Sequence, residues 1–155
     1  MKFKTREYGQ PIEILKYPEY KGAPCMVSDD GITADANGLK IVKAGTPLNA
    51  NGAKETTTYA LTADTAISVT KTYYTKTDNV YTVVAEPAVE DIAAYYEQVG
   101  SNVKGILLHD VDVTNGDAPG TLIFEGSVNV AKLTTNGITI SDAVKAALPR
   151  VTFFA

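Results

Sequence analysis

The stretch that decides the fold is residues 103–133, VKGILLHDVDVTNGDAPGTLIFEGSVNVAKL. Its first arm is a dense apolar run. Its second arm places Leu122, Phe124, Val128 and Val130 at even spacing, the period of a strand with one buried face. Residues 115–120 (NGDAPG), between the arms, are types that tolerate positive φ or fix a turn. The stretch therefore predicts an antiparallel hairpin.

Each arm of this hairpin contains one irregularity. In the first arm the apolar phase moves from positions 106 and 108 to positions 111 and 113, so we expect a bulge or twist near residues 109–110. In the second arm Gly126 interrupts the alternation. A glycine inside a strand marks a bend or the close approach of another backbone.

The sequence before the hairpin indicates compact β structure with tight corners. We expect short strands between residues 25 and 42, separated by turns at residues 29–31 and at Asn37-Gly38. The Asn-Gly pair is also a hairpin signal. Residues 44–48 turn the chain, and residues 49–54 form a polar loop.

The sequence after the hairpin predicts one short helix between two strands. We expect a loop at residues 133–137, a strand at 138–140, and a helix at 142–148 whose N-cap is Ser141 and whose Val144 and Leu148 face the core. Residues 151–154 are predicted as a core strand that closes the sheet. The alternative is that Phe154 is exposed and anchors a neighbouring subunit.

These segments together resemble a known family. The strings LKIVKAGTPL, GILLHDVDVTNGDAPGTLIFEGSVNVAKL and ISDAVKAALPRVTFF are similar to the head decoration proteins of tailed phages, the lambda D-like family. The resemblance covers residues 39–48 and 103–154 and does not extend to residues 59–99. It implies a mainly β, compact, β-clip-like domain with one short C-terminal helix, an extended N-terminal arm and a small β insertion.

The resemblance also implies a function. A member of this family is a structural virion protein, not an enzyme, that binds the outer surface of an expanded capsid and stabilises it. Its partner is the major capsid protein, and it usually forms a homo-trimer at local three-fold positions. The expected location is the outer surface of the virion, after synthesis in the host cytoplasm.

Composition and charge limit the other classes of function. No apolar run approaches the length of a membrane span, and the charged residues 1–10 do not fit a signal peptide, so we expect no membrane partner. The net charge of −4 argues against nucleic acid. The one cysteine, Cys25, cannot form an internal disulfide and is interpreted as a small buried hydrophobe.

Residues 1–21 are interpreted as an extended N-terminal arm. They have a net charge of +2, which leaves −6 for the remainder, and Pro18, Gly22 and Pro24 are expected to break any regular element. By position and character the arm matches the family's capsid-binding arm, which would make contacts through Phe3, Tyr8, Ile12 and Ile14. The alternative is that these side chains fold back onto the chain's own sheet.

Residues 59–99 differ in composition from the rest of the chain, because they are rich in Thr, Tyr and Ala. They are interpreted as an inserted Tyr- and Thr-rich β module in a core of residues 22–58 and 100–155. We expect strands at 71–76 and 80–84 around a turn at 77–79, with Tyr95-Tyr96 pairing back. A helix at 88–98 competes with this prediction. As alternative functions, the chain is the base of a head fibre, or the module binds a host glycan or protein through Tyr73, Tyr81 and Tyr95.

The sequence offers little support for chemistry. The only histidine, His109, lies beside Asp110, but adjacent strand residues point to opposite faces, and no nucleophile motif is present. A calcium loop that begins at Asp110 fails because position 6 is Asn115 and position 12 is Thr121. Asp112 and Asp117 are interpreted as solvated residues or loop caps. We therefore expect no metal, no cofactor and no enzymatic activity.

Overall fold

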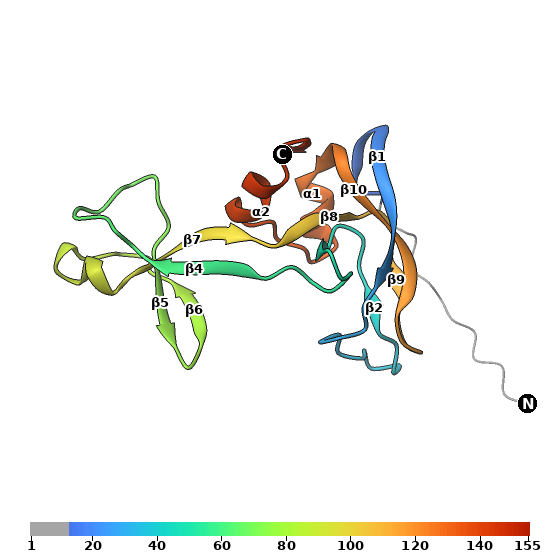
Figure 1. Ribbon diagram of the computed structural model, residues 1–155, viewed down its shortest axis with the longest axis horizontal. Coiled ribbons are helices and arrows are strands. Elements are labelled where there is room, and N and C mark those ends of the chain that lie inside the picture. Colours follow the sequence, from blue (N-terminus) through green and yellow to red (C-terminus); the bar gives the residue numbers. More distant parts are fainter. Residues whose placement is uncertain (1–12) are drawn as a thin grey trace, which may run out of the picture.

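The computed structural model describes residues 13–155 as a β-rich body from which a narrow arm projects (Figure 1). The predicted mainly β class is confirmed. The arm contains the predicted insertion, and its stalk is formed by β4 (Thr57–Leu61) and β7 (Tyr96–Ser101). After Asn102, β7 is followed by β8 (Val103–Leu107), which carries the chain back into the body.

The main sheet of the body has the strand order β1-β10-β8-β3, with β11 as a further partner of β10. The strands β1 (Leu15–Val27), β8, β3 (Pro47–Asn49) and β10 (Ala118–Asn129) pair antiparallel, whereas β11 (Val151–Phe154) pairs parallel to β10. The predicted hairpin is present between β8 and β10, where Leu107 pairs with Leu122 and Ile106 with Ile123.

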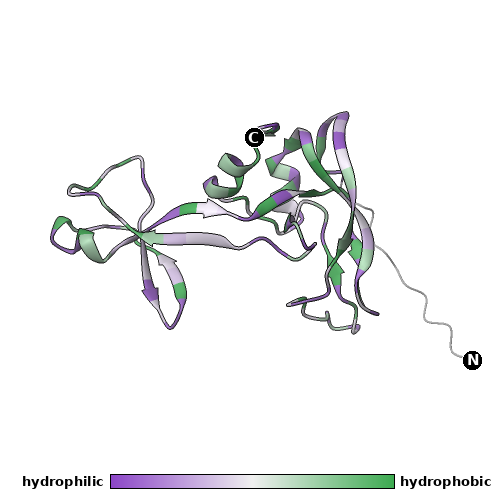
Figure 2. Ribbon diagram, viewed as in Figure 1, coloured by the Kyte–Doolittle hydropathy of each residue, from purple (hydrophilic) through white to green (hydrophobic). Residues whose placement is uncertain are grey.

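The central strand β8 is buried on both faces, not on one. Ile106 packs in a cluster with Leu133 and Val144 from the helices, and Leu107 packs in a second cluster on the opposite face. Apolar residues, drawn in green, recur along the strands of the body (Figure 2). The change of apolar phase in the sequence therefore reflects two cores, although the chain does leave the ladder between Leu107 and Val111 as predicted.

The irregularity at Gly126 is confirmed and changes the face of later residues. Gly126 has a φ of 151°, and a Cβ placed on it would lie 3.3 Å from the carbonyl oxygen of Glu19. Beyond it, Val128 packs in the helix-side cluster whereas Leu122 packs in the opposite one. The predicted single apolar face for the even positions was therefore wrong.

The prediction that the N-terminal arm extends to residue 21 was also wrong. β1 begins at Leu15 and extends past Pro18, Gly22 and Pro24 to Val27. Its pairing with β10 is interrupted at residues 16–19, which include Pro18, and shifts again between Lys21 and Gly22. An edge strand tolerates proline because one row of its backbone groups needs no partner, and two irregularities in the register absorb the misfit. The boundary between arm and core thus lies before residue 15.

The C-terminal helix was predicted correctly, but a second helix was missed. α2 (Asp142–Ala147) begins at Ser141, whose hydroxyl accepts a hydrogen bond from the Val144 amide. Residues 133–137 are not a simple loop, because α1 (Val130–Thr135) follows directly from β10 and is capped by Asn129. Residues 138–140 form no strand. The predicted strand at residues 151–154 is confirmed as β11.

The short strands β2 (Ile41–Val42) and β9 (Val111–Asp112) pair with each other. They and their loops cover the second core cluster, which includes Val42, Val111 and Val113. Asn37-Gly38 makes a turn with positive φ at Gly38, but the hairpin predicted there is absent. Strand β2 instead uses β9 as its partner, from much later in the chain.

The projecting arm is a four-stranded sheet in the order β4-β7-β5-β6. β5 (Tyr74–Thr77) and β6 (Val80–Val83) form the predicted hairpin, with Asp78 and Asn79 in its turn at positive φ. A single residue pair, Tyr74 with Tyr96, joins this hairpin to β7. Residues 88–98 divide between the two competing predictions: Val89–Ala94 is a 3₁₀ helix and Tyr96 onward is a strand.

Candidate functional site

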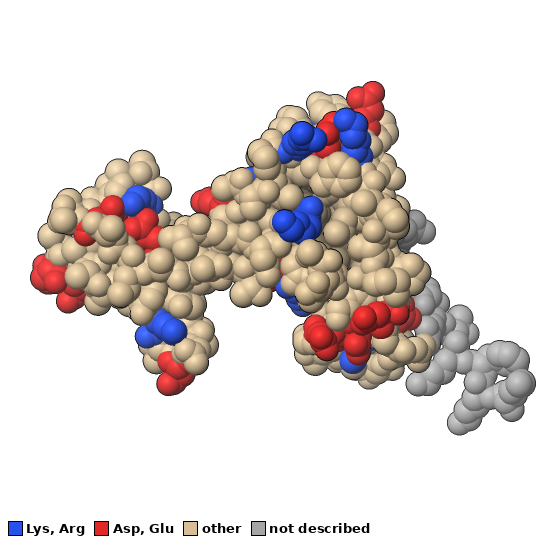
Figure 3. Space-filling model, viewed as in Figure 1, with Lys and Arg blue, Asp and Glu red and all other residues tan. Residues whose placement is uncertain are grey.

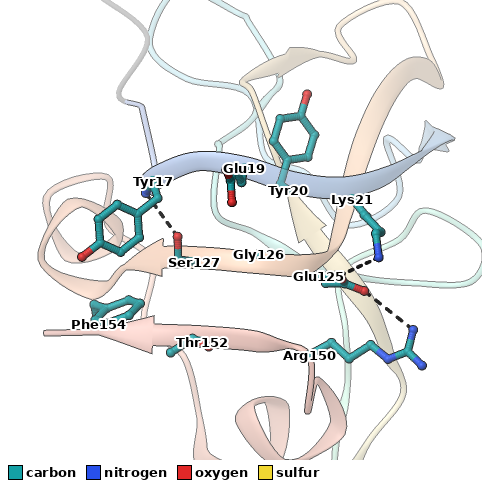
Figure 4. Close-up of a pocket in the computed structure, with 10 residues that line it drawn as sticks. All are labelled: Tyr17, Glu19, Tyr20, Lys21, Glu125, Gly126, Ser127, Arg150, Thr152 and Phe154. Carbon is teal, nitrogen blue, oxygen red and sulfur yellow. Dashed lines mark hydrogen bonds and ion pairs between the residues drawn. The ribbon is translucent and has the colours of Figure 1, made fainter.

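An open groove lies across β1, β10 and β11 (Figure 4). Its volume is about 500 Å³. Leu15, Val128 and Val151 from these strands are buried in the core, whereas other residues of the three strands, together with Arg150 just before β11, line the groove. The lining residues are Tyr17, Glu19, Tyr20, Lys21, Glu125, Gly126, Ser127, Arg150, Thr152 and Phe154.

One end of the groove is ionic. The Glu125 carboxylate lies 2.7 Å from Lys21 Nζ and 3.7 Å from Arg150, so one acid is shared by two cations (Figure 4). The hydrogen bond from Lys21, together with the charges of Lys21 and Arg150, holds the pKa of Glu125 below its usual range. Both cations remain largely exposed, with side chains 68% and 73% accessible. They retain N–H groups that can bind a ligand.

The other end of the groove is aromatic. The Tyr17 and Phe154 rings meet edge to face, with centroids 5.8 Å apart. The Tyr17 amide also donates to the Ser127 hydroxyl oxygen at 3.2 Å, which fixes β1 over β10 at this point. Tyr17 and Tyr20 are nonetheless two of the exposed large apolar side chains of the protein.

Strand β1 is exposed to solvent over most of its length. Leu15 and Val27 anchor its two ends in the core, and every residue from 16 to 24 is exposed. Ile14 is fully buried, so its predicted role as a contact residue is corrected in favour of the alternative, a side chain folded onto the chain's own core. The other predicted contacts, Phe3, Tyr8 and Ile12, lie outside the described residues.

The predicted outward adhesion surface of the insertion is not formed. Tyr73 and Tyr95 are 1% and 6% exposed and pack with Ile92 in a small core of their own. Their hydroxyl oxygens accept hydrogen bonds from the amides of Ser68 and Ala88. Only Tyr81 is partly accessible, and it stacks on Tyr59. Tyr73 and Tyr95 directly precede β5 and β7 and do not lie on the strands, and both rings pack into this small core.

The residues considered for chemistry do not converge. His109 is exposed, whereas Asp110 accepts hydrogen bonds from the Ala44 amide and from Lys43. Asp112 caps the turn by accepting from the Thr114 amide, which confirms the predicted loop-cap role. Cys25 is half-buried, and burial raises the pKa of its thiol. Residues 13–155 contain no cluster of His, Cys, Asp or Glu side chains able to hold a metal ion.

Charge is distributed unevenly over the visible face. Acidic side chains gather at the end of the body that carries β2, and mixed charges surround the C-terminal end (Figure 3). Across residues 13–155, no helix has the length and apolar character required to span a bilayer.

Sequence reasoning missed the groove. Its residues come from three strands that are distant in the sequence, and only Gly126, singled out as an irregularity, gave a local signal. Comparisons of the chain with protein-family models, with curated proteins and with solved structures found no match.

Proposed function

We propose that this chain is a structural virion protein that binds the outside of an expanded phage capsid and stabilises it. The family resemblance of residues 39–48 and 103–154 supports this function, and so does the exposed edge strand β1. The partner in the proposal is the major capsid protein. The trimer at local three-fold positions rests on the resemblance alone.

The observation that carries the proposal is the exposure of β1. Within the described residues β1 pairs with no strand other than β10, so its outer edge is open over most of its length, except at its C-terminal end, where Gly52 lies against the backbone of Met26 and Val27. An open edge accepts a further strand through backbone hydrogen bonds, and exposed side chains on the strand supply burial. Pro18 and Pro24 limit strand addition mainly to the segment between them.

Charge supports a contribution from the N-terminal residues. Residues 1–21 carry a net charge of +2 on a chain of net charge −4, and this excess comes from residues 1–12, because Lys16 and Lys21 are balanced by Glu13 and Glu19. An acidic strip on the partner would be attracted to residues 1–12. A protein that binds only the expanded shell stabilises that state by linkage, because free energy of binding is added to one conformation and not to the other.

The test is co-sedimentation with expanded and unexpanded shells of the parent phage. Three variants are compared with the full chain. The first is a deletion of residues 2–12, which leaves the buried Ile14 and Leu15 in place. The other two are Ala23→Glu on the exposed strand β1 and Val80→Glu on β6 of the projecting arm. The two glutamate substitutions are matched, since both put a negative charge on an exposed strand residue.

The proposal predicts saturable binding to expanded shells only. Ala23→Glu should weaken this binding about tenfold or more, because it puts charge into a buried contact, and Val80→Glu should leave it unchanged. Deletion of residues 2–12 should also weaken it. Binding to neither shell, or equal binding to both, would refute the proposal. Light scattering of the free protein gives its subunit number.

A further inference from the structure

We infer that the groove across β1, β10 and β11 is a binding site for a neutral oligosaccharide. The groove lies over the outer face of the sheet, whereas the capsid contact proposed above uses the free edge of β1. The inference therefore concerns a different side of the strand and does not depend on the decoration function.

The charges that line the groove cancel. Lys21 and Arg150 supply two positive charges, and Glu19 and Glu125 supply two negative ones. The ion pairs from Lys21 and Arg150 to Glu125 hold three of these groups close together before any ligand arrives. An anionic ligand would be attracted by the two cations and repelled by the two carboxylates, and a cationic ligand the reverse. An uncharged ligand with many hydrogen-bonding groups has no such conflict.

The polar groups of the groove suit hydroxyl groups. The Ser127 hydroxyl oxygen accepts from the Tyr17 amide, which leaves its own proton free to donate toward the groove. Thr152 supplies another hydroxyl, Glu125 and Glu19 supply acceptors, and Arg150 supplies donors. A sugar hydroxyl both donates and accepts, so it can use each of these groups in turn.

The aromatic end suits the apolar face of a sugar ring. The face of a tyrosine ring is electron-rich and attracts the weakly positive C–H bonds that project from one side of a pyranose. Phe154 meets Tyr17 nearly at right angles, with an interplanar angle of 87°, and this contact fixes the orientation of the exposed Tyr17 ring. Gly126 lies in the floor between the aromatic and ionic ends and carries no side chain to block a ligand.

The groove thus combines one aromatic platform with charged and hydroxyl groups that can form hydrogen bonds with a ligand. The groove is open, and its aromatic and ionic ends are separated along the direction of the strands (Figure 4), so it suits a chain of several sugar units that lies along β1, β10 and β11. A small, enclosed ligand would leave most of it unfilled.

The test uses the purified full chain on an array that carries neutral and acidic oligosaccharides, followed by titration of the best binder in solution. Tyr17→Ala removes the aromatic platform. Met26→Ala is its matched control, because Tyr17 and Met26 are both on β1 and are 55% and 54% exposed, and Met26 does not line the groove. Tyr17→Phe keeps the ring and removes only the hydroxyl. Thermal melting of each variant confirms folding.

We expect binding of a neutral oligosaccharide that Tyr17→Ala weakens about tenfold, a loss typical of one aromatic contact. Met26→Ala should have no effect, and Tyr17→Phe should keep most of the affinity. Because the ligand is uncharged, affinity should change by less than about twofold between low salt and roughly 0.5 M salt.

Three results would overturn the inference. The first is no retention of any oligosaccharide at millimolar concentration. The second is binding confined to acidic oligosaccharides and abolished by salt. The third is loss of shell binding in Tyr17→Ala without any glycan binding by the unmodified chain, which would make the groove part of a protein interface.

Discussion

Tyr59 and Tyr81 stack face to face across the projecting arm, with ring centroids 3.9 Å apart and planes 9° apart. They belong to β4 and β6, the two outer strands of a four-stranded sheet, which would lie far apart in a flat sheet. The sheet is therefore bent where the single Tyr74–Tyr96 pair joins its two halves. Rings of all four tyrosines fill the resulting corner.

This contact predicts that Tyr59 and Tyr81 are energetically coupled. A double-mutant cycle with Tyr59→Ala and Tyr81→Ala should give a coupling free energy of about 0.5–1.5 kcal/mol, the range for aromatic pairs. The measurement is denaturant unfolding of the four proteins. A cycle of Tyr59→Ala with Thr82→Ala, on the opposite face of β6, should give none. Equal coupling in both cycles would contradict the stacked corner.

Truncation of Ile123 tests the core. Ile123 is fully buried between β8 and the helices, so Ile123→Ala should lower the free energy of unfolding by about 2–5 kcal/mol. Val80→Ala, at a residue 62% exposed, should change it by less than about 0.5 kcal/mol. Urea unfolding of both variants measures the difference. Similar losses would mean that Ile123 does not face the core.

A pair of glycine substitutions tests the irregularity in β10. Gly126→Ala should destabilise the protein by about 1–3 kcal/mol, because its φ of 151° disfavours a side chain and the new Cβ would lie 3.0 Å from Cβ of Tyr20. Gly100→Ala is the control, since a Cβ there meets nothing within 4 Å. It should be neutral or slightly stabilising. Thermal unfolding distinguishes the two, and an equally tolerated Gly126→Ala would count against the close approach of β1.

The projecting arm should become less stable in acid. Lys71 Nζ lies 2.7 Å from Asp64 Oδ2, and the Tyr73 hydroxyl donates to the same oxygen at 2.9 Å. The hydrogen bonds from Lys71 and Tyr73 hold the pKa of Asp64 below its usual range. Because the folded-state pKa is the lower one, this stabilisation is present above the unfolded-state pKa and is lost as pH falls through the folded-state pKa.

The change should appear below about pH 4. NMR signals of Tyr73 and Lys71 followed down a pH titration would detect it. In Asp64→Asn the arm should be less stable at neutral pH and its stability should depend less on pH in acid. An unchanged acid dependence in that variant would show that Asp64 does not hold the loop.

Local signals allowed part of the fold to be predicted. The cap at Ser141 defined α2, the positive φ tolerated by Asp78 and Asn79 defined a hairpin, and Gly126 marked a real irregularity. Each of these features depends on a few neighbouring residues. They were therefore visible without knowledge of the tertiary structure.

The features that the sequence did not reveal depend on distant partners. The prolines of β1 were interpreted as breakers, because its pairing with β10, far along the chain, could not be seen. α1 is rich in β-branched residues, which are weak helix formers, and the sequence predicted a loop over its last residues. The groove needs Lys21, Glu125 and Arg150 side by side, and only the folded sheet brings them together.

The proposal that this chain stabilises an expanded capsid can be tested by the temperature at which DNA-filled expanded heads lacking the protein release their DNA. Addition of the saturating full chain should raise that temperature, and the rise should be much smaller with Ala23→Glu. Unexpanded shells should show no shift in their disruption temperature. An unchanged release temperature at saturating protein would contradict the account.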